Sequence, residues 1–198
     1  MIGFDEFMDI YDRPGTIVLL EGKRKVKEEE QEKLTAFGRQ LAEFSEYIIF
    51  RSGNAAGSDE LFSKGVAEVD PGRLQVFSPY RGHRKRYVLT EEILSLDDLD
   101  MSMEQDLIEC SLGRAGMAKL VQQYLEGKRH KYAMRAAYII RDCMKVVGSN
   151  SCNMMPASFA FFYDDLTKPM SGGTGHTMEV CKSRGIPFAD QKIWFDWL

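Results

Sequence analysis

The sequence has few of the residues that bind transition metals. It contains three histidines and four cysteines in 198 residues, and the cysteines form no CxxC pair. Structural zinc and iron–sulfur sites need clusters of these residues at short, regular spacing. We therefore predict no metal site, and we interpret the cysteines as reduced, mostly buried thiols.

Long hydrophobic runs are also missing. A membrane-spanning helix needs about 20 predominantly apolar residues in a row, and no stretch approaches that length. The N-terminal segment MIGFDEFMDIYDRPG is acidic, whereas a secretory signal begins with a basic region that leads into an apolar one. These absences predict that the protein has no membrane partner and is cytoplasmic.

An excess of positive charge is a third absence, since the net charge is −4. A protein that coats nucleic acid presents a broad cationic surface, so nucleic acid is not the expected partner. The segment RGHRKR at 81–86 is the densest cationic cluster. A solvated loop explains such a cluster, and capture of a phosphate is the alternative.

The composition is otherwise that of a folded protein. Hydrophobic residues make up 44% and charged residues 28% of the chain, which are ordinary values for soluble domains. A chain of this length can bury one substantial core without dividing. We therefore predict a single domain over residues 1–198.

The apolar pattern alternates between strands and helices. Short apolar runs predict strands at 16–20, 47–50, 74–77, 158–163 and 186–189. Apolar residues three or four positions apart, together with helix start and stop signals, predict helices at 26–44, 59–69, 103–125, 132–147 and 174–183. Such alternation implies an α/β fold, in which helices cover both faces of a parallel sheet of about five strands in the order 3-2-1-4-5.

The connection between the third and fourth strands is long. It has roughly 75 residues, far more than one crossover helix requires. We expect a helical insertion at about 88–128. Gly113 and Gly116 weaken its main helix and divide it in two. The insertion is either a structural elaboration that also serves a dimer contact, or a lid over a ligand site.

Polar segments that each contain glycine follow four of the predicted strands: EGKRK, RSGNAAGSD, SPYRGHRKRY and DDLTKPMSGGTGHT. The carboxyl ends of parallel strands meet at one edge of the sheet, where ligands bind. A glycine-rich loop that begins a helix presents free N–H groups and the positive end of the helix dipole to an anion. The pattern predicts a crevice for phosphate groups, although tight packing of strand and helix also explains such glycines.

Common cofactor motifs are absent. A P-loop would need glycine at Met170 and lysine at His176, and the dinucleotide motif GxGxxG would need glycine at Met178. No cofactor is predicted.

The same segments resemble the SLOG superfamily of Rossmann-like domains, and within it the branch labelled YspA or cpYpsA-related. The similar segments are TIVLLEGKR, IIFRSGNAAGSD, RDCM and SGGTGHTMEV. The superfamily includes the LOG phosphoribohydrolases and the DNA-processing protein DprA. The resemblance covers nearly all of the chain apart from the first dozen residues and the insertion. It implies a Rossmann-like three-layer fold with a pocket for a nucleotide or a nucleotide-derived molecule.

The resemblance also implies which residues bind the ligand. They are Gly22, Lys23 and Arg24 on one side, Ser52, Gly53, Asn54, Gly57, Ser58 and Asp59 on a second, and Arg141, Gly172, Gly173, Thr174, Gly175, His176 and Thr177 on a third. Asn54 stands where the family usually has glycine.

LOG enzymes carry the motif GGxGTxxE, whose glutamate acts with an arginine to hydrolyse an N-glycosidic bond. The glycines and the glutamate match here, but His176 replaces the threonine and Asp142 stands where lysine usually follows the arginine. The resemblance therefore implies Glu179 and Arg141 as catalytic residues, in an altered setting. A solvated glutamate that compensates the helix dipole is the other interpretation of Glu179.

These observations predict a sensor or binding protein for a nucleotide-derived small molecule, held at the carboxyl ends of the strands. The alternative is a phosphoribohydrolase or related N-glycosidase that acts on nucleoside monophosphates. Single-stranded DNA binding, which the resemblance to DprA allows, is the least favoured. The C-terminal segment KIWFDWL is too aromatic to stay in water, so we expect it to pack on the sheet edge or on a second subunit of a homo-oligomer, a dimer or larger.

Overall fold

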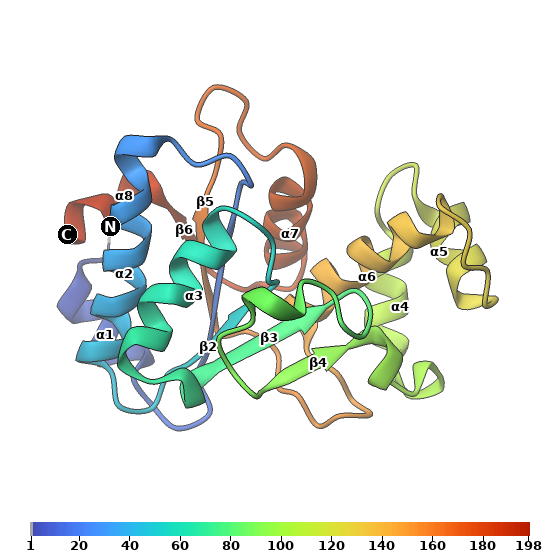
Figure 1. Ribbon diagram of the computed structural model, residues 1–198, viewed down its shortest axis with the longest axis horizontal. Helices are drawn as coiled ribbons and strands as arrows, with labels where there is room; N and C mark the ends of the chain where they lie inside the picture. Colours follow the sequence, from blue (N-terminus) through green and yellow to red (C-terminus); the bar gives the residue numbers. More distant parts are fainter. Residues whose placement is uncertain (1) are drawn as a thin grey trace.

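The computed structural model describes residues 2–198, and within them the chain forms a six-stranded, all-parallel sheet (Figure 1). The strands are β1 (Ile17–Gly22), β2 (Ile49–Ser52), β3 (Leu74–Ser78), β4 (Ile93–Ser95), β5 (Phe159–Tyr163) and β6 (Phe188–Asp190). Their order is β4-β3-β2-β1-β5-β6. The predicted α/β fold and the predicted order of five strands are confirmed, with one strand added.

Helices cover both faces of the sheet and complete three layers. One face packs against α1 (Phe4–Tyr11), α2 (Gln31–Phe44), α3 (Ser58–Val69) and α8 (Gln191–Trp194). The other packs against α4 (Gln105–Leu112), α5 (Ala118–Leu125), α6 (Ala133–Val147) and α7 (Gly172–Ser183). No helix within residues 2–198 combines the length and the apolar character needed to cross a membrane.

Strand β1 shows why the sequence gives this arrangement. Val18 and Leu20 point into the core beneath α1, α2 and α3, whereas Leu19 points into the core on the opposite face. All three side chains are fully buried. A strand that is buried on both faces reads as a continuous apolar run, which is why this one was predictable.

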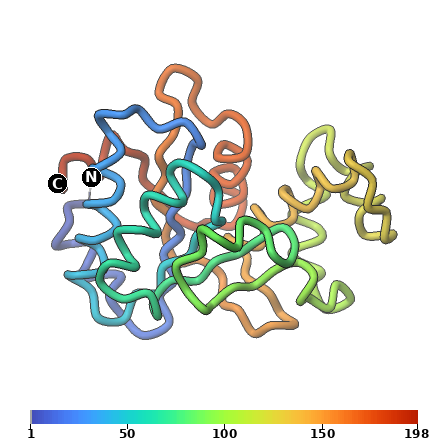
Figure 2. The backbone as a smooth tube through the Cα atoms, viewed as in Figure 1, coloured from blue at the N-terminus to red at the C-terminus, as the bar shows by residue number. Residues whose placement is uncertain are grey.

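The predicted helical insertion contains one strand that the sequence analysis did not expect. Strand β4 lies inside the segment 88–128 and adds a parallel edge to the sheet beside β3, with Ile93 opposite Val76. The remainder of the insertion forms α4 and α5, and the chain breaks between them at 113–117, as Gly113 and Gly116 predicted. In the tube view this segment projects to one side of the sheet (Figure 2).

The direction in which the chain crosses the sheet reverses between β1 and β5. From β1 the chain proceeds through β2 and β3 to β4, and β5 then pairs on the other side of β1, from Val18 opposite Phe159 to Gly22 opposite Tyr163. Loops that leave two such strands diverge and open a crevice beyond their carboxyl ends. The loops after β1 and β5 are therefore the expected walls of a ligand site.

The C-terminal aromatic residues pack within the chain. Trp194 is fully buried, stacks on Phe37 with ring centroids 4.5 Å apart, and donates a hydrogen bond to the Phe162 carbonyl at 3.1 Å. The ring of Trp197 lies 6.0 Å from that of Phe4. This segment thus covers one face of the sheet together with α1 and α2, and a homo-oligomer stays a prediction.

Candidate ligand-binding site

A cavity of about 690 Å³ lies beyond the carboxyl ends of β1 and β5. Its volume is within the range of small-molecule sites. The walls are the segment after β1, one side of α6, the loop after β5 and the first turn of α7. The residues predicted to bind a ligand that do line it are Gly22, Lys23, Arg24, Asp59, Arg141, Gly172, Gly173 and Thr174.

The first turn of α7 supplies backbone donors to this cavity. The helix begins at Gly172, and no side chain caps it within the described chain. Its first intrahelical bond at this end joins the Gly175 amide to the Ser171 carbonyl at 3.2 Å. The amides before Gly175 have no partner in the helix, so they and the helix dipole favour an anion at this point.

Gly175 lets the loop after β5 approach α7 closely. A Cβ atom at this position would lie 1.9 Å from the Met170 carbonyl oxygen. The Met170 amide in turn donates to Asp164 Oδ2 at 2.6 Å. The third glycine of SGGTG therefore serves packing, and it is Gly172 and Gly173 that line the cavity.

Cationic side chains surround the same opening. Lys23 Nζ donates to Ser171 Oγ at 2.7 Å and lies 3.9 Å from Asp165 Oδ2, while the exposed Arg24 lines the rim. Arg141 is only 5% exposed. It donates to the Gly53 carbonyl, and its Nε–H is buried with no hydrogen-bond partner in residues 2–198.

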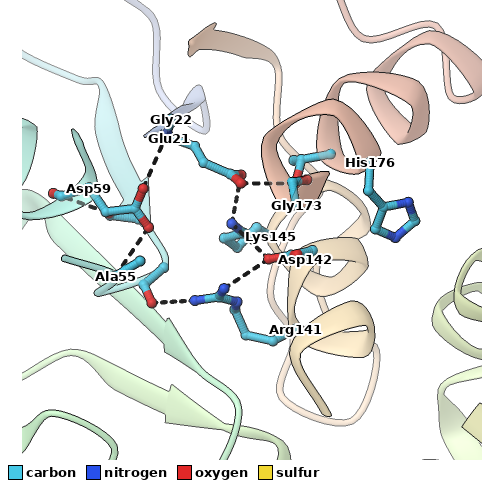
Figure 3. A network of polar contacts seen from close by, with 12 residues as sticks. Glu21, Gly22, Ala55, Asp59, Arg141, Asp142, Lys145, Gly173 and His176 are labelled. Atoms are coloured by element: carbon cyan, nitrogen blue, oxygen red, sulfur yellow. Dashed lines mark hydrogen bonds and ion pairs between the residues drawn. The ribbon is translucent and has the colours of Figure 1, made fainter. Parts of the chain in front are cut away.

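Beneath the cavity lies a chain of buried charges (Figure 3), of which the sequence analysis named Arg141 and Asp142 but not Glu21 or Lys145. Lys145 Nζ forms ion pairs with Glu21 Oε2 at 2.6 Å and with Asp142 Oδ1 at 3.1 Å. Asp142 also pairs with Arg141 at 2.9 Å, and the Thr177 hydroxyl donates to Glu21 Oε1 at 3.0 Å. A signal was present, because positions 141, 142 and 145 fall on one side of a helix.

Burial and ion pairing shift the pKa values of these charged groups in opposite directions. Burial raises the pKa of Glu21 to about 7, and the neighbouring Lys145 ammonium only partly opposes it. Burial would also raise the pKa of Asp142, but Lys145 and Arg141 outweigh it and lower that pKa. For Lys145, burial is outweighed by Asp142 and Glu21, so its pKa is raised. The cavity floor therefore holds one carboxyl group that titrates near neutral pH.

Most of the second glycine-rich segment, 52–59, contacts protein atoms and does not line the cavity. Gly57 has φ +89°, and a Cβ atom there would lie 2.2 Å from the Arg24 carbonyl oxygen. The Ser58 amide and hydroxyl both donate to the Lys23 carbonyl, at 3.1 and 2.6 Å. Asp59 accepts from the Gly22 amide at 3.2 Å. This segment fixes the loop after β1, and of its predicted ligand residues only Asp59 reaches the cavity.

The remaining predicted residues of that segment are buried beneath the surface. Ser52 is fully buried, and Gly53 lies against the Arg141 guanidinium. Asn54 adopts φ +52°, and its side chain donates to the His83 carbonyl at 3.3 Å. Through that bond the segment holds the loop after β3.

The loop after β3 does not line the cavity, which differs from the predicted convergence of four loops. Its cationic cluster, 81–86, is partly neutralised by acidic partners. Arg81 pairs with Asp98 and Arg84 pairs with Glu60, each at 2.5 Å.

The structure does not bring the two predicted catalytic residues together. Arg141 lines the first cavity, whereas the Glu179 side chain is 62% exposed, lies 3.4 Å from Arg114 and lines a separate cavity of about 480 Å³. His176 lines that second cavity as well and is buried, with Nε2 3.5 Å from Cys143 Sγ. The Thr177 side chain is buried, and its hydroxyl donates a hydrogen bond to Glu21.

Within residues 2–198 no group of three or more histidine, cysteine, aspartate or glutamate side chains is arranged to hold a metal ion.

Comparisons with known proteins give little further information. No family model matches the chain, and no curated protein does. A solved structure of DNA processing protein A from Helicobacter pylori, reported for its single-stranded DNA binding mode, is similar at 14% identity with a TM-score of 0.48, over 96% of this chain and 69% of that chain. A likeness this distant says nothing about what the chain binds. Membership of the SLOG superfamily stays a prediction.

Proposed function

We propose that the protein binds a nucleotide-derived anion in the 690 Å³ cavity, with a phosphate group at the first turn of α7. The observation that carries the proposal is the meeting of an uncapped helix N-terminus with the side chains of Lys23, Arg24 and Arg141 around one cavity. Backbone donors, the helix dipole and cationic side chains together make a phosphate site.

Two unsatisfied buried atoms favour a larger ligand than phosphate alone. Arg141 Nε–H is a hydrogen-bond donor and Asp164 Oδ1 is an acceptor, and neither has a partner among the described residues. Both residues are at most 5% exposed and line the cavity. Leaving such an atom unpaired costs about 1–3 kcal/mol. A nucleotide offers phosphate oxygens that can accept from Arg141 Nε–H, and hydroxyl or amino groups that can donate to Asp164 Oδ1.

A binding or sensing role fits the site better than hydrolysis does. The N-glycosidase that the resemblance implies would use Glu179 together with Arg141 beside the bond that breaks, but Glu179 lines the other cavity. Glu21 lines the first cavity, but its two oxygens already contact Thr177 and Lys145.

Isothermal titration calorimetry with inorganic phosphate, ribose 5-phosphate and the four common nucleoside monophosphates tests the proposal. We expect affinity to increase in that order. A charge-assisted contact contributes about 1.5–3 kcal/mol, so Lys23→Met should weaken binding by at least about tenfold. Lys64→Met is the matched control, because it removes an exposed charge from α3, outside the cavity.

Three outcomes would contradict the proposal: no binding of any of these compounds at millimolar concentration, equal effects of the two lysine variants, or equal affinity for phosphate and every nucleotide. An oligonucleotide titration and chromatography for released base are run beside it. Tight, salt-dependent binding of single-stranded DNA without nucleotide binding, or base release that Glu179→Ala abolishes, would replace it with an alternative function.

A further inference from the structure

Acidic side chains also line the cavity of about 690 Å³, although the proposed ligand is an anion. The carboxylate-bearing residues in its wall are Glu21, Glu30, Asp59, Asp142, Asp164 and Asp165. A carboxylate repels a phosphate. Each of these side chains therefore either has a partner in the protein or contacts another group of the ligand.

Five of these carboxylates have partners in the protein. Four of them pair with cations: Glu21 with Lys145, Glu30 with Lys27, Asp142 with Lys145 and Arg141, and Asp165 with Lys23. Asp59 instead accepts from two backbone amides, that of Gly22 at 3.2 Å and that of Ala55 at 3.3 Å, with one oxygen for each. These five side chains hold the walls of the cavity together.

Asp164 differs from the other five. Its side chain directly follows β5 and is 3% exposed. Oδ2 accepts from the Met170 amide at 2.6 Å, whereas Oδ1 is buried and has no hydrogen-bond partner within residues 2–198. A buried acceptor without a donor is unfavourable. A ligand that donates a hydrogen bond to Oδ1 removes this cost.

The protein holds the Asp164 carboxylate in one orientation. The Gln191 side chain accepts from the Asp164 amide at 2.9 Å and donates to the Asp164 carbonyl at 2.6 Å. Gln191 is itself buried at the start of α8. Together with the Met170 amide, these contacts fix both the backbone and the side chain. Oδ1 is therefore a preorganised acceptor, which binds a donor with little loss of conformational freedom.

Asp164 lies close to the proposed phosphate position. Met170, which donates to Asp164, packs its carbonyl against Gly175 in the first turn of α7. In a nucleoside 5′-monophosphate one methylene group joins the phosphate to the sugar, and the base lies beyond the sugar. The hydrogen-bond donors nearest to the phosphate are thus the sugar hydroxyls, and they are the groups that Oδ1 is placed to accept from.

We propose that Asp164 Oδ1 accepts a hydrogen bond from the 2′- or 3′-hydroxyl of the ligand, so that the site selects ribonucleotides over nucleotides that lack these hydroxyls. This inference rests on the proposed function, because the phosphate at α7 is what brings the sugar to Asp164. A ligand without the hydroxyls leaves Oδ1 buried and unpaired, which a site built for a hydroxyl disfavours.

Isothermal titration calorimetry of the full chain tests the selectivity. The ligands are inorganic phosphate, the four ribonucleoside 5′-monophosphates and their 2′,3′-dideoxy counterparts. We expect each ribonucleotide to bind at least about tenfold more tightly than its dideoxy counterpart. Equal affinities within every pair overturn the role of Asp164 and leave the phosphate site standing. No binding of phosphate or of any nucleotide overturns both proposals.

The variant Asp164→Asn keeps the shape of the side chain. Its carbonyl oxygen can accept from the Met170 amide, and its amino group then replaces the unpaired oxygen. The preference for ribonucleotides should fall at least about threefold, since a hydrogen bond to a charged acceptor is roughly twice as strong as a neutral one. Affinity for inorganic phosphate should not fall, because a negative charge near the phosphate is removed.

Asp9→Asn is the matched control. It removes the same charge from the exposed face of α1, outside the cavity, and should leave the preference unchanged. A preference that Asp164→Asn leaves intact overturns the proposal. If that variant does not fold, a crystal structure of the wild-type protein with adenosine 5′-monophosphate decides, and sugar hydroxyls that contact residues other than Asp164 overturn it.

Discussion

Lys145 is a fully buried lysine whose charge is retained because two carboxylates contact it. Its ammonium has no access to solvent and lies between Glu21 and Asp142. An unpaired charge in this position would be very costly, and pairing alone does not make it stabilising relative to an apolar core. The group therefore holds β1 and α6 in one relative position under the cavity.

Replacing Lys145 with methionine should lower the free energy of unfolding by about 3–5 kcal/mol, because it leaves buried carboxylates without their cation. Urea denaturation followed by circular dichroism measures the loss. The exposed Lys64→Met variant should change stability by no more than about 0.5 kcal/mol.

The double variant Glu21→Gln, Lys145→Met tests the pairing itself. Its loss should be smaller than the sum of the two single losses, since residues in contact are not additive. Additive losses would show that the two groups do not interact.

Stability should also depend on pH through Glu21. Burial raises its pKa from 4.5 to about 7, so between these values the folded protein holds a proton that the unfolded chain has released. The contribution of Glu21 to the free energy of unfolding is complete below about pH 4.5 and is lost as the pH rises through about 7. The free energy of unfolding contributed by this group therefore falls with rising pH.

Urea denaturation of wild type and Glu21→Gln at several pH values between 5 and 8 measures that contribution as a difference. His83, whose pKa burial lowers to about 4, gives a slope of the opposite sign and cancels in the comparison. If the free energies of unfolding of the two proteins change in parallel with pH, the raised pKa of Glu21 is contradicted.

At the scale of one element, α7 depends on the close approach at Gly175. Gly175→Ala should destabilise the protein by about 1–3 kcal/mol, because its Cβ meets the Met170 carbonyl oxygen and the chain must move. Gly173→Ala should stay within about 1 kcal/mol of wild type, since its Cβ would lie 3.5 Å from Asp142 Oδ2 and alanine favours the helix. Equal losses in urea denaturation would show that the contact with Met170 is unimportant.

The elements that could be predicted from the sequence are those whose pattern depends on burial alone. Strand β1 is a continuous apolar run because both its faces are covered. Strand β4 was missed because it is three residues long and its Ile93 side chain is 44% exposed. Only its pairing with β3, which is not local in the sequence, makes it a strand.

The candidate site was predictable to a similar extent. Parallel strand ends meet, so the segment after β1 and the first turn of α7 were expected to share a cavity, as they do. The inward turn at Gly57 depends on its contact with the Arg24 backbone, which no local pattern shows. Glu179 lies five residues after Thr174, about 140° further round the helix, and so faces the other cavity.

For the whole molecule, the buried C-terminal tryptophan joins the last helix to the main core. Trp194→Ala should cost about 3–5 kcal/mol of unfolding free energy, because a full indole and its hydrogen bond to the Phe162 carbonyl are lost from a closed interior. Phe44→Ala is the control, since that ring is 65% exposed and its loss should change stability by no more than about 0.5 kcal/mol. Thermal and urea unfolding measure both. Similar losses in the two variants would mean that Trp194 contributes no more than a surface ring.

The pairing of β1 with β5 also sets the order in which the protein is completed during synthesis. The bond between the Ile17 amide and Ser158 at the base of this pair spans 141 residues. Contacts so distant along the chain form slowly, since a long loop must close first. A nascent chain therefore emerges with one edge of β1 unpaired until β5 has left the ribosome. That exposed edge is where an interrupted or truncated product would aggregate.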